Sequence, residues 1–241
     1  MKKLITKILI TTLTVIFNLN TTSAQDYGDL QYALSGYSYR SVGPAFMSGR
    51  IADIAIDSNN ENVWYVAVGS GGVWKTKNAG TTWMPLTDNM PFYSTGSVTI
   101  DPNDSSRIWV GTGENVAGRH VGIGHGIYLS KDSGSTWDNM GLKKSEHISK
   151  IIVHPDNSDI IWVASQGPLW NSGGDRGLFM SNDGGNTWSN KLYVNEWTGV
   201  TDIIIDPTNP DILYAATWQR HRNVASLIDG GPGTSIYKST D

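Results

Sequence analysis

The sequence contains no cysteine, so it can form neither a disulfide nor a lipid-modified cysteine. It is also poor in charge: 17% of its 241 residues are Asp, Glu, Lys or Arg, and the net charge is −4. No run of Lys or Arg follows residue 7, so the sequence lacks the basic stripe that a nucleic-acid-binding surface requires. Leucine heptads are missing too. Glycine (27 residues) and tryptophan (10 residues) are abundant, which is typical of an all-β protein with many turns.

The first 24 residues have the pattern of a cleavable export signal. Lysines at positions 2, 3 and 7 precede an apolar stretch from Ile8 to Phe17, and small residues follow at Thr22, Ser23 and Ala24. The apolar stretch is too short to cross a membrane, and no other segment approaches the required length. We therefore predict a protein that is secreted, periplasmic or on the bacterial cell surface, with a genuine N-terminal helix as the alternative.

A repeated motif divides the rest of the chain. It has the pattern S/T-x-D/N-x-G-x-T-W, which we call the box, and successive box tryptophans are 54 and 51 residues apart. Its copies are Thr76 to Trp83, Ser130 to Trp137, Ser181 to Trp188 and, cut short, Ser239 to Asp241. Before each box lie an apolar segment that ends in Asp or His and a second one rich in aromatic residues. Each period therefore offers four short strands, the signature of a propeller blade, whereas a β-solenoid would need a shorter period.

We predict an all-β fold: the N-terminal part of a β-propeller of four-stranded blades, with three complete blades and an incomplete fourth. The expected organisation is a signal peptide (1–24), a lead segment (25–45) and the partial propeller (46–241). The blades are expected near 49–90, 96–142, 147–194 and 200–241. Because the last box stops after its Asp, we expect the natural protein to be longer. The rest of the propeller, and possibly a C-terminal domain, would then lie in the same full-length chain.

The box is expected to form the turn between strands three and four. Its Asp or Asn can accept backbone N–H groups two residues further on, its Gly can adopt positive φ, and its Trp can pack between blades. These requirements explain the box residues without any chemistry. The structural box residues are Asn78, Gly80, Trp83, Asp132, Gly134, Trp137, Asp183, Gly185, Trp188 and Asp241.

Strand direction predicts where a binding site lies. In an up-and-down blade, the connections between strands two and three share one face with the links between blades, and the remaining turns share the other. Blade 1 makes its 2–3 connection with Gly69 to Gly72 alone. The other blades use long loops: Gly111 to Gly126, Ser165 to Gly177, and Thr217 to Thr234. Long loops in a compact repeat are usually functional, so we predict a binding surface on this face.

These loops are rich in arginine and tryptophan, which bind carboxylates and stack on flat groups such as sugar rings. Other roles stay open: Glu114 could pair with Arg119, and Trp170 could fill a blade interface. His120 and His125 lack the carboxylates of a metal site, so neither a metal nor another cofactor is expected. The predicted ligand-binding residues are Arg50, which could instead pair with Asp53, together with Glu114, Arg119, Trp170, Arg176, Trp218, Arg220 and Arg222.

The boxes, with the segments Ser41–Ile51, Gly111–Glu114 and Gly167–Trp170, resemble a large group of secreted bacterial proteins. These carry Asp-box (BNR) propellers of the sortilin and xyloglucanase-like type and are often labelled glycosyl hydrolases. The resemblance covers residues 37–241 and implies the propeller fold and a structural role for the box. It implies much less about activity, because one fold hosts many functions.

Two catalytic relatives can be compared with the sequence. Xyloglucanases of this type are inverting enzymes, and one catalytic Asp lies in a Thr-Asp-Ile-Gly-Gly segment after strand two of blade 1. The matching stretch here is Val68 to Gly72, which places Gly69 at the Asp position. Because inversion needs two carboxylates, the catalytic residues stay unknown. Sialidases carry an Arg-Ile pair that Arg50-Ile51 matches without their usual Pro.

We therefore expect a propeller that binds a glycan or a peptide on the face of the 2–3 loops. The alternative is a glycoside hydrolase, xyloglucanase-like or sialidase-like, whose acids come from unusual positions or from blades outside this sequence. A second alternative is a structural module of a larger cell-surface protein.

Overall fold

The computed structural model describes residues 32, 35–36 and 50–239, so the predicted signal peptide, most of the lead segment and Asp241 lie outside the described residues. The fold below is that of the unit Ser48–Asp241. Residues 50–239 form sixteen strands. They are β1 (Ile51–Ile56), β2 (Trp64–Val68), β3 (Gly72–Thr76), β4 (Met84–Pro85), β5 (Thr95–Asp101), β6 (Asp104–Thr112), β7 (Ile127–Ser130), β8 (Asp138–Asn139), β9 (Ile148–His154), β10 (Asn157–Ser165), β11 (Gly177–Ser181), β12 (Ser189–Leu192), β13 (Thr198–Ile205), β14 (Leu213–Arg222), β15 (Leu227–Asp229) and β16 (Ile236–Ser239).

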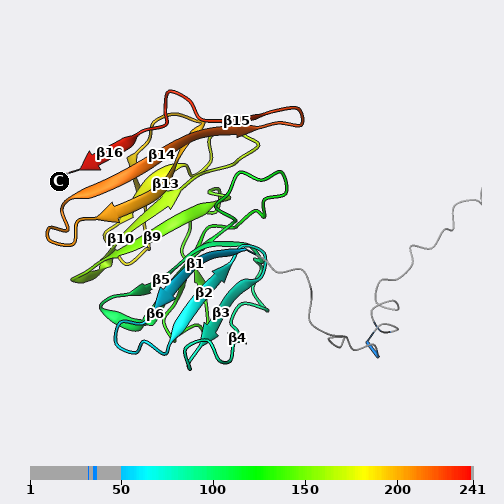
Figure 1. Cartoon of the computed structure of the whole chain (residues 1–241), viewed down its shortest axis with the longest axis vertical. Coiled ribbons are helices and arrows are strands. Elements are labelled where there is room, and N and C mark those ends of the chain that lie inside the picture. The colour runs from blue at the N-terminus through cyan, green and yellow to red at the C-terminus, as the bar shows by residue number, and fades with distance from the viewer. Residues whose placement is uncertain (1–31, 33–34, 37–49, 240–241) are drawn as a thin grey trace, which may run out of the picture. The chain divides into compact units, whose positions relative to one another are not determined.

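The strands form four antiparallel sheets that follow one another as blades of a β-propeller (Figure 1), which confirms the predicted fold class. The first three sheets have the orders β1-β2-β3-β4, β5-β6-β7-β8 and β9-β10-β11-β12. In the fourth, β14 pairs with β13 and β16 and also with the short strand β15. The first strands β1, β5, β9 and β13 contact one another in succession, as the inner strands of a propeller do.

The hydrophobic core lies between the blades. One cluster joins blades 1 and 2 around Tyr65 and Val110, a second joins blades 2 and 3 around Trp109, and a third joins blades 3 and 4 around Trp162. Because blades cover both faces of an inner sheet, the second strands β2, β6 and β10 each contain a continuous buried run rather than an alternating pattern. In β10, the four residues Ile161 to Ala164 are all buried.

The box forms a tight turn whose hydrogen bonds differ from those expected. The Asp132 carboxylate accepts the backbone N–H of Thr136, four residues further on rather than two, at 2.8 Å. It also accepts the hydroxyls of Thr136 and Ser130, at 2.6 and 2.8 Å. The Ser130 hydroxyl in turn accepts the N–H of Gly134, whose φ is +94°, at 2.8 Å. The box serine or threonine is thus as much a part of the turn as the Asp.

The box tryptophan and glycine contact the preceding blade, as expected for a residue packed between blades. The ring of Trp188 lies edge-on to Trp109 at a centroid distance of 6.5 Å, and its indole N–H donates to the Met140 carbonyl. A Cβ at Gly185 would lie 2.6 Å from the Trp109 ring. In blade 1, Trp83 instead meets Trp64 of its own blade at 6.4 Å.

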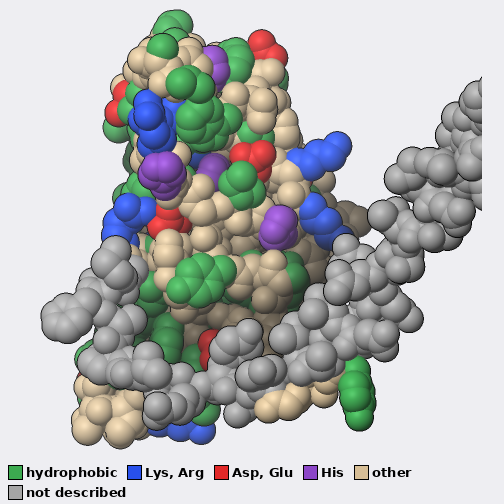
Figure 2. All heavy atoms as spheres, turned by 90° about the vertical axis from the view of Figure 1, so that its right-hand side faces the viewer, with side chains coloured by type: hydrophobic (Ala, Val, Ile, Leu, Met, Phe, Trp, Pro, Cys, Tyr) green, Lys and Arg blue, Asp and Glu red, His purple; other side chains and the backbone are tan. Residues whose placement is uncertain are grey.

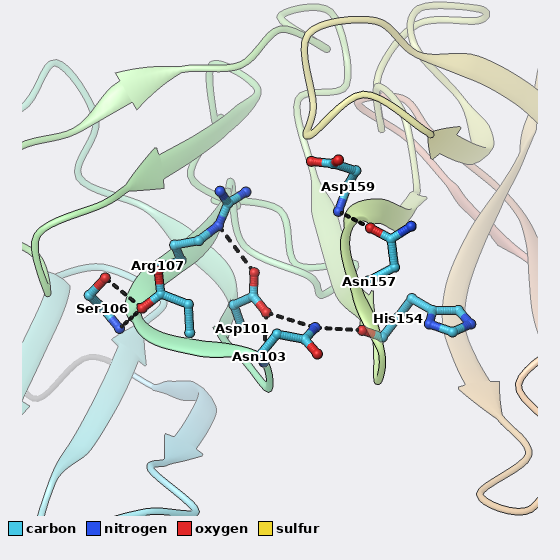
Figure 3. A network of polar contacts seen from close by, with 8 residues as sticks. Asp101, Asn103, Ser106, Arg107, His154, Asn157 and Asp159 are labelled. Atoms are coloured by element: carbon cyan, nitrogen blue, oxygen red, sulfur yellow. Dashed lines mark hydrogen bonds and ion pairs between the residues drawn. The ribbon is translucent and has the colours of Figure 1, made fainter.

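The bond to an N–H two residues further on occurs elsewhere, at the turn between strands one and two. Asp101 accepts the N–H of Asn103 at 2.9 Å and pairs with Arg107 at 3.1 Å. In blade 3 a histidine replaces the Asp, and Nδ1 of His154 accepts the N–H of Asp156 at 3.1 Å. Figure 3 shows how Asn103 also donates to the His154 carbonyl and so ties two neighbouring turns together. This face of the propeller is therefore occupied by turn-forming contacts.

Candidate functional site

The opposite face carries the long 2–3 loops and the links between blades, and we call it the loop face. The hairpin with β15 and the blade 2 loop lie on the right-hand side of Figure 1, and Figure 2 looks onto that side. In the upper half of Figure 2, cationic, anionic and histidine side chains gather around hydrophobic ones. The predicted site residues with known positions come from blades 1 to 4 and lie in or beside these loops.

Arg50 and Glu114 form an ion pair between blades 1 and 2. Nη2 of Arg50 lies 2.6 Å from Oε1 of Glu114, and the Arg50 side chain is 58% exposed whereas that of Glu114 is 4% exposed. The hydroxyl of Ser70 donates to the same oxygen at 3.0 Å, and the N–H of Gly122 donates to Oε2 at 2.9 Å. Ser70 and Gly122 thus hold the Glu114 carboxylate in place, and Glu114 in turn positions the partly exposed guanidinium of Arg50. Neither alternative partner is used: Arg50 does not pair with Asp53, nor Glu114 with Arg119.

The Glu114 carboxylate also lies against Gly69, the position that the resemblance assigns to a catalytic Asp. A Cβ at position 69 would lie 2.9 Å from Oε1 of Glu114 and 3.4 Å from the Arg50 carbonyl. A side chain at position 69 would therefore displace Glu114. A carboxylate is present at this place in the fold, but it comes from the blade 2 loop.

Arginines of blades 2 and 4 hold the loop face together across blade 3. Arg220 and Arg222 of β14 donate to the carbonyls of Val116 and Ala117 in the blade 2 loop, both at 3.1 Å. In return, Arg119 of that loop donates to the Val224 carbonyl in the β14–β15 turn at 2.8 Å. We call these three bonds the arginine clasp. Two of its arginines, Arg119 and Arg222, keep some exposure, whereas Arg220 is fully buried.

Arg176 lies inside its own loop rather than on the surface. It is 1% exposed, and its guanidinium donates to five backbone carbonyls. They belong to Gln166, Pro168, Asn171, Gly173 and Trp197. Burial lowers the pKa of Arg176 to about 10, and burial, followed by the charge of Arg176, lowers that of Arg220 to about 9. Both guanidinium groups therefore hold the loop backbone in place through hydrogen bonds. Neither is exposed to a ligand in this conformation.

The aromatic side chains of the loop face are partly exposed. Trp170 is 37% exposed, and Trp218 is half-buried beneath the Arg220 guanidinium at 5.2 Å. Two tyrosines in the links between blades are more exposed than either, Tyr93 at 67% and Tyr193 at 60%. The sequence analysis did not single them out, although strand direction alone places these links on the same face as the long loops.

The link between blades 2 and 3 holds further polar residues that the sequence analysis passed over. His147 is 1% exposed, and its pKa is lowered to about 3, first by burial and then by the charge of Arg220. Beside it, Glu146 is half-buried, and burial raises its pKa. The N–H of Gln166 bonds to the His147 carbonyl at 2.9 Å and so joins this link to the blade 3 loop.

Within the part of the chain that the structure describes, no three His, Cys, Asp or Glu side chains gather as a metal site would require. In the same part of the chain, no helix combines the length and the hydrophobicity needed to cross a membrane.

The four sheets define this part of the chain as a β-propeller. No family model matches the chain. It is 25% identical over 183 residues to the oligoxyloglucan-reducing end-specific xyloglucanase of Emericella nidulans, which covers 69% of this chain and 21% of that protein. It is 27% identical over 228 residues to the xyloglucanase of Hypocrea jecorina, with 81% and 25% covered. The chain thus spans about a fifth to a quarter of the curated relatives it matches.

Solved structures show the same fold. An ancestral GH74 enzyme superimposes with a TM-score of 0.60 at 20% identity, covering 86% of this chain and 24% of that one. The GH74 xyloglucanase from Xanthomonas campestris gives 0.55 at 16% identity, with 79% and 29% covered. These structures show the shared fold, and the curated relatives fit the hydrolase alternative better than the simple binding propeller.

Proposed function

We propose that this chain is part of a glycoside hydrolase-like protein that engages a β-glucan of the xyloglucan type on its loop face. The supporting observation is that four curated xyloglucanases match the chain at 22–27% identity. A polysaccharide of this size is met outside the cytoplasm, which agrees with the export signal expected for residues 1–24. The assignment of the box to the Asp-box (BNR) group of sortilin-like propellers belongs to the same proposal.

Arg50 is the proposed polar anchor for the glycan. Its guanidinium has five N–H groups in a planar fork, and Glu114 is its one ion-pair partner among the described residues. More than half of the side chain, 58%, is exposed to solvent. Because the ion pair with Glu114 already orders the Arg50 side chain, binding a sugar hydroxyl costs little further conformational entropy.

The exposed aromatic side chains are the proposed stacking positions. Sugar rings present C–H faces that pack on flat aromatic rings, and Trp170, Trp218, Tyr93 and Tyr193 lie on the loop face with exposed or half-buried rings. They belong to blades 3 and 4 and to two links between blades. An extended glucan is a ligand that can contact such spaced positions, whereas a single monosaccharide cannot.

Glu114 is the proposed carboxylate for any cleavage. It occupies the space in front of Gly69, where the resembled xyloglucanases have an Asp. The arginine clasp and Arg176 are assigned a different role, that of holding the loops around this place. Arg119 and Arg222 retain exposed surface and stay candidates for ligand contact, while Arg176 and Arg220 act through the loops that they support.

The proposal is tested by incubating the protein with xyloglucan, with other β-glucans and with an unrelated α-glucan. Affinity electrophoresis measures binding, and reducing-end assays measure cleavage. We expect binding to xyloglucan that weakens in R50A by about tenfold, the size of a lost charge-assisted hydrogen bond. K131A is the matched control, because Lys131 is an exposed cation in a box turn on the opposite face.

The outcomes separate the functional classes. Cleavage that disappears in E114Q supports the hydrolase, whereas binding without cleavage supports a glycan-recognising propeller on the same face. If xyloglucan and the other β-glucans neither bind nor release reducing ends, the proposed function is wrong.

A further inference from the structure

The link between blades 2 and 3 contains a strained residue on the loop face. Glu146 has a φ of +56°, a conformation that residues with side chains rarely adopt. Its carbonyl accepts the N–H of Gly124 at 2.8 Å, and a Cβ at Gly113 would lie 1.8 Å from the same oxygen. The blade 2 loop therefore fixes the strained backbone closely, and such strain tends to persist where a site uses it.

The carboxylate of Glu146 has no hydrogen-bond donor among the described residues, although the side chain is half-buried. Burial raises the pKa of Glu146, and the charges of Arg176 and Arg220 act in the opposite direction. Both guanidinium groups donate to backbone carbonyls instead, at Gln166 and Gly167 among others. A partly desolvated carboxylate without a donor costs free energy that a ligand hydroxyl can recover.

Buried polar atoms without partners lie in the same neighbourhood. Within the described residues, Ser145 Oγ, His147 Nδ1, Gln166 Oε1 and Arg220 Nε have no hydrogen-bond partner. All four side chains belong to residues that are at most 2% exposed. Ser145 and His147 flank Glu146, and Gln166 bonds to the His147 carbonyl. Native proteins rarely leave buried polar atoms unpaired, so four in one neighbourhood mark the support of Glu146 as unusually polar.

We propose that Glu146, positioned by the buried residues Ser145, His147 and Gln166 beneath it, forms a subsite for one hydroxyl-bearing ring of a neutral glycan. The ionised Glu146 carboxylate, which is half-buried rather than fully buried, accepts a hydrogen bond from a ligand hydroxyl. The ionised Glu146 carboxylate repels the carboxylate of an acidic sugar that it would contact directly, so the subsite favours a neutral ring over a uronic acid. This inference rests on the proposed function and specifies its ligand class.

The subsite has a pH signature with a defined sign. Protonation of Glu146 removes the charge that strengthens its acceptor oxygens, so affinity falls as the pH is lowered through the raised pKa of this group. The charged groups that act on Glu146 are Arg176 and Arg220, and the titratable His147 is its neighbour in the chain. Replacing Glu146 alone leaves those groups in place, so the difference between the two proteins isolates its contribution.

The test is calorimetric titration with a neutral xyloglucan oligosaccharide at pH 7 and at pH 4.5. We expect E146Q and E146G to bind about tenfold more weakly at pH 7 and E146Q to lose the pH dependence of the parent protein. The strain-matched control is A79G, because Ala79 has a φ of +51° in a box turn on the other face. Glycine relieves strain at both positions, so neither glycine variant should melt earlier than the parent.

The outcomes divide the two proposals. If R50A loses affinity and E146Q keeps it, the proposed function stands and the subsite is refuted. If the parent protein does not bind the oligosaccharide, both proposals fail. Tighter binding of a uronic acid oligosaccharide than of the neutral one would also overturn the subsite. E146Q is nearly isosteric, so it decides the question even if E146G folds poorly.

Discussion

The box glycines combine a special backbone conformation with close packing against the neighbouring blade. Gly134 has a φ of +94°, and a Cβ there would lie 2.5 Å from Cδ1 of Leu86 in blade 1. We expect G134V to lower the free energy of unfolding by about 1–3 kcal/mol, measured by urea denaturation. The comparison is G173V, because Gly173 also has positive φ but no atom within 4 Å of its Cβ position. Equal losses in both variants would show that packing against Leu86 contributes nothing.

The box carboxylates predict a specific loss of stability in acid. Hydrogen bonds from Thr136, from both its side chain and its N–H, lower the pKa of Asp132 to about 2, and Thr187 does the same for Asp183. Because the pKa is depressed in the folded state, the stabilisation is present above pH 4 and is lost as the pH falls towards 2.

Asn78 shows how this prediction can be isolated, since it occupies the Asp position of the first box and accepts the N–H of Thr82 at 2.9 Å. We expect the double variant D132N/D183N to melt earlier than the parent at pH 7, because it lacks the ionised carboxylates, and to lose less stability than the parent between pH 4 and pH 2. Thermal melts across that range provide the measurement. A parallel acid loss in both proteins would show that the box carboxylates are not responsible.

At the scale of elements, the blade 3 loop combines a buried organiser with an exposed ring. Its buried Arg176 donates to five carbonyls, so R176A should lower the free energy of unfolding by about 1–3 kcal/mol through the unpaired carbonyls it leaves. Trp170 in the same loop is 37% exposed, so W170A should leave stability nearly unchanged and weaken xyloglucan binding by about 1–3 kcal/mol. Chemical denaturation and affinity measurements on both variants decide this. If R176A is as stable as the parent, Arg176 does not organise the loop.

Arg176 was predicted as a ligand contact because it lies in a long loop. Charged residues in loops are usually exposed, and the partners that bury Arg176 are backbone carbonyls, which no sequence pattern marks. The strand β15 could not be predicted from the sequence either. Its three residues pair with the end of β14, within a segment that was expected to be a loop. The blades were predictable because their strands and boxes repeat. The loop face does not repeat, so its contacts had to come from the structure.

Glu146 and His147 were missed for a different reason. Strand direction places the links between blades on the loop face, but their residues look like ordinary turn and surface residues in sequence. Positive φ at a glutamate and burial of a histidine are tertiary features. Reading the links together with the long loops would have brought both residues into consideration.

At the scale of the molecule, two sheets present apolar side chains without a neighbour among the described residues. Ile54 of β1 is 52% exposed and Ile204 of β13 is 60% exposed, and each lies among further exposed apolar residues of its own blade. Exposed apolar patches promote association, so we expect the 241-residue chain to self-associate with rising concentration. The double variant I54K/I204K should reduce this in light scattering. A strictly monomeric parent protein at high concentration would argue against it.

The central claim is that one face of the propeller, the loop face, engages the glycan while the box turns on the other face only hold the blades. Hydrogen–deuterium exchange with and without bound xyloglucan oligosaccharide tests this most directly. The account predicts slower exchange in the blade 2 and blade 3 loops, 113–126 and 166–176, and in the link that contains Glu146. It predicts unchanged exchange in the box turns around Asp132 and Asp183. Protection confined to the box turns would contradict the account.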